Sequence, residues 1–101
     1  MSEIKAGDNG TVLELLIRDK GAIVPLNGAI VDAVIKNGAR RFVKQAVRIV
    51  DPANGICETL LTREDLANSG RYQIQGVVKY PSDGDKDFAS DVVYFQVGYR
   101  I

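Results

Sequence analysis

The chain has 101 residues, enough for one domain of ordinary size, and 46% of them are apolar, as is usual for a protein with a buried core. Its 13 basic and 13 acidic side chains balance, so it lacks the basic excess typical of nucleic-acid-binding proteins. Histidine is absent and cysteine occurs once, which excludes histidine-based triads, histidine metal sites and an intrachain disulfide.

From these features we expect one domain over residues 1–101 that is not an enzyme and needs no cofactor or metal. The apolar runs are too short to cross a membrane, so no membrane contact is expected. We expect Cys57, which lies in an apolar segment, to be a buried structural thiol rather than a reactive one.

Apolar and polar residues alternate along most of the chain, which is the period of β-strands. Asn37-Gly38 and Asn54-Gly55 are typical of hairpin turns. Short strands separated by frequent turns predict an all-β fold, an immunoglobulin-like antiparallel sandwich. Val43, Val47 and Ile49 are expected to share one face of the third strand. The predicted strands cover residues 11–18, 29–36, 42–50, 56–62, 71–80 and 88–99.

One short helical turn is expected near residues 62–67, because Thr62 can accept a hydrogen bond from the backbone N–H of Asp65. Leu66 would then point into the core. The following Gly70-Arg71-Tyr72 step is typical of the tyrosine corner of immunoglobulin-like domains, in which the hydroxyl bonds back to nearby backbone. The alternative is a strand tyrosine with its ring in the core. Ile74 stands where antibody-type domains place their second cysteine.

The densest basic group consists of Lys36, Arg40, Arg41 and Lys44. Its ordinary interpretation is a set of solvated charges that prevent pairing at a strand edge, and its alternative is a surface for an anionic partner. The acidic loop at residues 83–87 has carboxylates spaced as at the start of a calcium loop. Lys86 interrupts it and no glutamate completes it, which favours a solvated hairpin tip.

Four apolar or aromatic residues, Val12, Leu16, Tyr94 and Tyr99, are expected on outward-facing positions and are candidates for a protein interface. Ordinary surface apolarity is an equally good interpretation of them. A carbohydrate- or host-surface-binding sandwich is the alternative function. The absence of tryptophan and an aromatic content of 7% count against it, because sugar sites need aromatic platforms.

Several motifs together resemble the N-terminal domain of the upper baseplate protein family of tailed bacteriophages and prophages of Gram-positive bacteria. The order and spacing of the motifs carry the resemblance, which extends over nearly the whole chain. They are Gly7-Asp8-Asn9-Gly10-Thr11, Val24-Pro25-Leu26-Asn27-Gly28-Ala29, Asp51-Pro52-Ala53-Asn54-Gly55, Gly70-Arg71-Tyr72, Val78-Lys79-Tyr80-Pro81 and Phe95-Gln96-Val97.

The resemblance implies a virion structural protein of the tail baseplate, made in the host cytoplasm and present in many copies. It would dock on the tail hub and position receptor-binding proteins. The resemblance brings no catalytic motif, so it assigns no catalytic residue to this chain.

Overall fold

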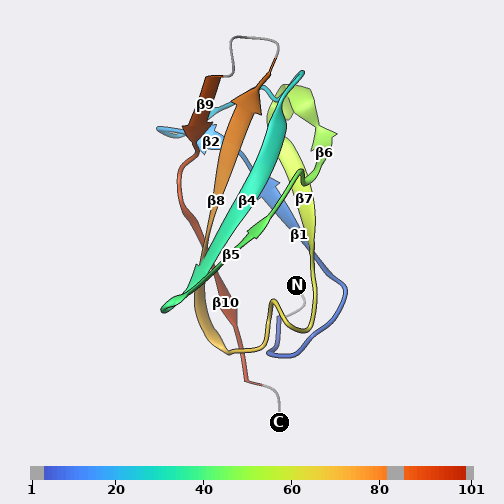
Figure 1. Ribbon diagram of the computed structural model, residues 1–101, viewed down its shortest axis with the longest axis vertical. Coiled ribbons are helices and arrows are strands. Elements are labelled where there is room, and N and C mark those ends of the chain that lie inside the picture. Colours follow the sequence, from blue (N-terminus) through green and yellow to red (C-terminus); the bar gives the residue numbers. More distant parts are fainter. Residues whose placement is uncertain (1–3, 82–85, 100–101) are drawn as a thin grey trace.

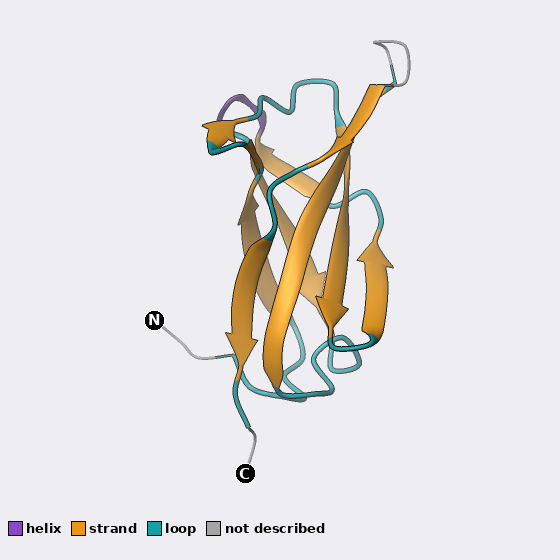
Figure 2. Ribbon diagram, turned by 90° about the vertical axis from the view of Figure 1, so that its left-hand side faces the viewer, coloured by secondary structure: helices purple, strands orange, loops and turns teal. Residues whose placement is uncertain are grey.

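The computed structural model of the chain describes residues 4–81 and 86–99. Strands with alternating inward and outward side chains form two antiparallel sheets, which pack face to face (Figures 1 and 2). The smaller sheet has the order β1-β7-β6, with β1 at Thr11–Leu16, β7 at Ile56–Leu61 and β6 at Arg48–Asp51. The larger has the order β10-β8-β4-β5, with β10 at Val93–Val97, β8 at Gly70–Tyr80, β4 at Ile30–Asn37 and β5 at Arg40–Lys44.

Four short elements complete the fold. Strand β9 at Lys86–Ala89 pairs with the end of β8, and β2 at Arg18–Asp19 forms a hairpin with β3 at Ala22–Ile23. A 3-10 turn, η1, covers Pro52–Asn54. The two strand orders match the B-E-D and G-F-C-C′ sheets of immunoglobulin-like domains, which confirms the predicted all-β sandwich.

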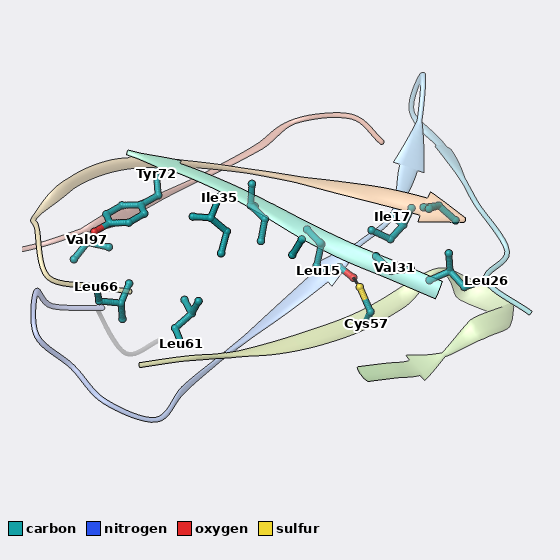
Figure 3. Close-up of a cluster of buried hydrophobic side chains, with 13 residues drawn as sticks. Leu15, Ile17, Leu26, Val31, Ile35, Cys57, Leu61, Leu66, Tyr72 and Val97 are labelled. Carbon is teal, nitrogen blue, oxygen red and sulfur yellow. Dashed lines mark hydrogen bonds between the residues drawn. The ribbon is translucent and has the colours of Figure 1, made fainter. Parts of the chain in front are cut away.

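Inward-facing side chains of both sheets make one core (Figure 3). The alternation predicted along residues 11–18, 29–36, 56–62 and 71–80 is observed in β1, β4, β7 and β8. Each fully buried aliphatic or aromatic side chain contributes roughly 1.5–3 kcal/mol by leaving water. The buried apolar residues are Leu15, Ile17, Leu26, Val31, Ala33, Ile35, Cys57, Leu61, Leu66, Tyr72, Ile74, Val78 and Val97.

The corner between β7 and β8 contains the expected helical turn, as one i-to-i+4 turn that does not extend into a helix. Leu66 N–H donates to the Thr62 carbonyl at 3.1 Å, and Leu66 is fully buried. Thr62 and Asp65 exchange hydrogen bonds: Asp65 N–H donates to Thr62 Oγ1 at 3.3 Å, and Thr62 N–H donates to Asp65 Oδ2 at 2.8 Å. This reciprocal pair is a capping box, with an aspartate in the usual place of glutamate.

Tyr72 closes this corner. Its ring is fully buried, and its hydroxyl donates to the Asn68 carbonyl at 2.6 Å, which is the tyrosine-corner arrangement. The ring also stacks on Phe95, its direct partner on β10, with ring centroids 5.0 Å apart. Gly70, with φ of 118°, begins β8, and Ile74 lies in the core one inward position beyond Tyr72.

The expected single strand over residues 42–50 is wrong. The chain leaves the larger sheet after β5 and enters the smaller sheet at β6. Ala46 lies between them with φ of 49°, and its N–H donates to Asp32 Oδ1 at 2.9 Å. The inward face changes parity at this crossing: Val43 is exposed, whereas Val47 and Ile49 pack against the core.

The expected strand over residues 88–99 is also divided. β9 and β10 both pair with β8, but their registers differ by one residue. Ser90 lies between them: its N–H donates to the Gly76 carbonyl at 2.7 Å, and its hydroxyl accepts from Gly76 N–H at 2.9 Å. A side-chain hydrogen bond therefore replaces a ladder bond at this bulge.

Cys57 is fully buried on β7, and its thiol donates to the Leu15 carbonyl at 3.6 Å. Burial raises the pKa of the Cys57 thiol to about 11. We expect a disulfide reagent at mildly alkaline pH to modify Cys57 roughly two orders of magnitude more slowly in the native chain than in denaturant, because little thiolate forms. Thiol absorbance assays would measure both rates. Equal rates would contradict a buried thiol.

Candidate interaction surfaces

The outer side of the smaller sheet carries exposed apolar side chains. Val12 on β1 and Leu60 on β7 are directly opposite each other, and 57% and 56% of their surfaces are exposed. Four residues further along, Leu16 is opposite Ile56. We call this surface the three-stranded face; its outward residues are Val12, Glu14, Leu16, Arg48, Val50, Ile56, Glu58 and Leu60.

Charged residues lie between the two apolar pairs of the three-stranded face. Glu14 is directly opposite Glu58, and Arg48 on β6 forms an ion pair with Glu58 at 3.2 Å. A shallow groove of about 280 Å³ runs beside Val12 and Leu60. Along the strands, the three-stranded face is therefore apolar at both ends and acidic in the middle, with the cation Arg48 on the neighbouring strand β6.

The outer side of the larger sheet has a different composition. The strand registers align four outward residues in one row across β10, β8, β4 and β5, in the order Tyr94, Gln73, Lys36 and Arg41. The guanidinium of Arg71 lies over the Tyr94 ring, 4.0 Å from its centroid. We call this surface the basic face; its outward residues are Val34, Lys36, Arg41, Val43, Arg71, Gln73, Gln75 and Tyr94.

The predicted basic group divides into two parts. Arg40 donates to the carbonyls of Glu64 and Asp65, and Lys44 forms an ion pair with the Asp65 carboxylate, so these two cations hold β5 to the corner. Lys36 and Arg41 remain on the basic face. Arg40 and Lys44 therefore fit neither interpretation of the group, whereas Lys36 and Arg41 are exposed.

Asp65 is mostly buried at this corner. Burial alone would raise its pKa, but the Lys44 ammonium and the Thr62 N–H outweigh burial, and the pKa of Asp65 lies below its ordinary value. Its charge thus contributes stability above the unfolded pKa of about 4, and this contribution is lost as the pH falls through the folded pKa.

We expect Asp65→Asn to lower the free energy of unfolding by about 2 kcal/mol at neutral pH, because charged hydrogen bonds are lost. The difference from the unchanged chain should shrink as the pH falls below about 4. Urea unfolding across this pH range measures it. Glu64→Gln, an exposed neighbour, is the control and should change stability by no more than about 0.5 kcal/mol. If Asp65→Asn lowered the free energy of unfolding by the same amount at every pH, the stabilising role of the Asp65 charge would be contradicted.

The four predicted interface residues do not form one surface. Val12 and Leu16 lie on the three-stranded face, Tyr94 lies on the basic face, and Tyr99, 84% exposed, follows the end of β10. The sequence interpretation missed Leu60 and Val50. Leu60 lies between the buried residues Thr59 and Leu61, so the alternation of β7 already placed it outward.

A third surface lies along the open edges of the two sheets. A groove of about 520 Å³ runs beside Leu16 on β1 and Val93 on β10. Asp91 also lines this groove, and its carboxylate accepts hydrogen bonds from the N–H groups of Lys20 and Gly21 at 3.0 and 2.9 Å. These bonds lower the pKa of Asp91, with the bond from Gly21 the larger cause. Asp91 therefore fixes the β2–β3 hairpin against this edge.

Within residues 4–81 and 86–99, no group of acidic, cysteine or histidine side chains is arranged to hold a metal ion. Of the acidic loop at residues 83–87, residues 83–85 lie outside the described residues, and Lys86 and Asp87 begin β9. Across the same part of the chain, no helix has the length and apolar character needed to span a membrane. The sequence matches no model of a known protein family and no curated protein.

Proposed function

We propose that this chain is a structural assembly module that acts by binding other proteins through its sheet faces. The observation that carries the proposal is the pair Val12 and Leu60, adjacent on the three-stranded face and each more than half exposed. Leu16 and Val50 extend the apolar surface. Adjacent exposed apolar residues with a charged neighbourhood are typical of protein contact surfaces.

The resemblance to the upper baseplate family supports a specific setting for this module, the tail baseplate of a bacteriophage. There it would be a virion structural protein, with the tail hub, receptor-binding proteins and further copies of itself as the classes of partner. The immunoglobulin-like strand order agrees with the fold that the resemblance implies.

Protein contact is better supported than sugar binding. A sugar platform requires a free aromatic face, and Arg71 covers one face of the Tyr94 ring at 4.0 Å. Tyr72 and Phe95 stack on each other inside the sandwich. The apolar residues of the three-stranded face are aliphatic, and they suit a protein surface better than a sugar ring.

Light scattering tests the proposal with the chain alone and mixed with the candidate tail-hub protein. We expect a mass above that of the monomer, or a complex with the hub. The double change Val12→Asp and Leu60→Asp should weaken the association at least about tenfold, equivalent to about 1.4 kcal/mol. Ile23→Asp is the control, because Ile23 is similarly exposed but lies on the β2–β3 hairpin. A chain that stays monomeric and does not bind the tail-hub protein would contradict the proposal.

A further inference from the structure

Two pairs of like charges stand directly opposite each other, one on each outer face of the sandwich. Glu14 on β1 faces Glu58 on β7, and Lys36 on β4 faces Arg41 on β5. Like charges in directly opposed positions destabilise a sheet. The fold thus carries two unfavourable pairs, of opposite sign and on opposite sides.

Within the described residues, the basic pair has no acidic partner. No ion pair in residues 4–81 and 86–99 involves Lys36 or Arg41, and the next residue in their row is the neutral Gln73. The acidic residues of this sheet, Asp32 and Asp87, lie towards the other end of β8, near Lys79. Lys79 itself is paired with Asp32 at 3.2 Å.

The acidic pair is only partly compensated. Arg48 forms an ion pair with Glu58, but Arg48 is largely exposed, and no ion pair in the described part of the chain involves Glu14. Each face therefore keeps at least one charge of one sign available to a partner.

The apolar residues around the two charged pairs have matching spacing. On the three-stranded face, Val12–Leu60 lies two residues along the strands from Glu14–Glu58. On the basic face, Val34–Val43 lies two residues along the strands from Lys36–Arg41. When the three-stranded face of one copy meets the basic face of another, Glu14–Glu58 can contact Lys36–Arg41. Val12–Leu60 can then contact Val34–Val43.

We propose that copies of this chain associate front to back, with the three-stranded face of one copy against the basic face of the next. This deepens the proposed assembly function and rests on it, because it names the partner of the three-stranded face. The contact is heterologous, and the two faces are on opposite sides of the sandwich (Figure 2). Such contacts repeat from copy to copy and give a closed ring or an open filament.

Two charge reversals test the geometry without endangering the fold. Glu14→Lys and Arg41→Glu each remove one like-charge opposition, so each monomer should have a Tm equal to or above that of the unchanged chain. Each variant alone should associate at least tenfold more weakly, as measured by sedimentation velocity over a range of concentrations. Salt should weaken the association of the unchanged chain.

Mixing the two variants is the decisive experiment. Glu14→Lys keeps an intact basic face, and Arg41→Glu keeps an intact three-stranded face, so one intact contact can form between the two variants. The mixture should therefore form heterodimers more strongly than either variant associates with itself. Asp87→Lys, on β9 at the far end of the larger sheet, is the control and should leave association unchanged.

Three results would overturn the front-to-back contact. One is a monomer that nevertheless binds the tail hub, which would leave the proposed function standing. A second is self-association that Arg41→Glu does not weaken. The third is a mixture of the two variants that stays monomeric while the unchanged chain assembles. Failure of both self-association and hub binding would instead remove the proposed function itself.

Discussion

Tyr72→Ala is expected to lower the free energy of unfolding by about 3–5 kcal/mol, the range for removing a buried aromatic ring. The ring is fully buried, it stacks on Phe95, and its hydroxyl is held by the Asn68 carbonyl. Truncation would open a cavity where the corner joins β8 and β10. Such a loss is a large part of the stability of a domain of this size.

The contributions of the Tyr72 hydroxyl and of the Tyr72 ring to stability can be measured separately. Tyr72→Phe keeps the ring and deletes one hydrogen bond at 2.6 Å, so it should cost about 1–2 kcal/mol. Urea unfolding followed by circular dichroism measures both changes. Tyr94→Ala, on an exposed tyrosine of the same sheet, is the control and should cost less than about 1 kcal/mol. A similarly small loss for Tyr72→Ala would contradict the buried corner.

Gly55→Ala is expected to cost about 3 kcal/mol, a large effect for one added methyl group. Gly55 has φ of 67°, a left-handed conformation that favours glycine. A Cβ at this position would lie 2.7 Å from the Val24 carbonyl oxygen and 3.0 Å from that of Ile17. Both neighbours are backbone atoms, so relief requires movement of the chain where β1, β3 and β7 meet.

Gly38→Ala provides the matched control for Gly55. Gly38 has a similar φ of 61°, but a Cβ there would meet nothing within 4 Å. Its replacement should therefore cost only the conformational strain, about 1–2 kcal/mol. Thermal unfolding of both variants gives the difference. Equal losses of stability for the two variants would mean that the close approach of backbone atoms to Gly55 adds nothing to the cost of Gly55→Ala.

Local chemistry was enough to predict the sandwich and its corner. The strand period and the turns identified most strands, and Gly70, Tyr72 and the Thr62–Asp65 pair identified the corner between β7 and β8. These features depend on residues within about ten positions of one another along the chain, so a single sequence carries them.

The errors came from long-range contacts. The crossing after β5 depends on Ala46 binding Asp32, fourteen positions earlier, and the break in the last strand depends on Ser90 binding Gly76. Neither hydrogen bond can be predicted from the alternation of the neighbouring residues. The opposed charges on the two faces depend on strand register, which the alternation alone does not fix.

The central position of β8 has a consequence for how the chain folds. This strand pairs with β4 on one side and with β9 and β10 on the other. The paired residues Ile35 on β4 and Ile74 on β8 are about 40 residues apart in sequence. Closing so long a loop costs entropy before any contact compensates it, which is why sandwiches of this kind fold in milliseconds to seconds. During synthesis, β4 leaves the ribosome before β8, so the backbone N–H and C=O groups on the edge of β4 that pairs with β8 stay unpaired until β8 follows.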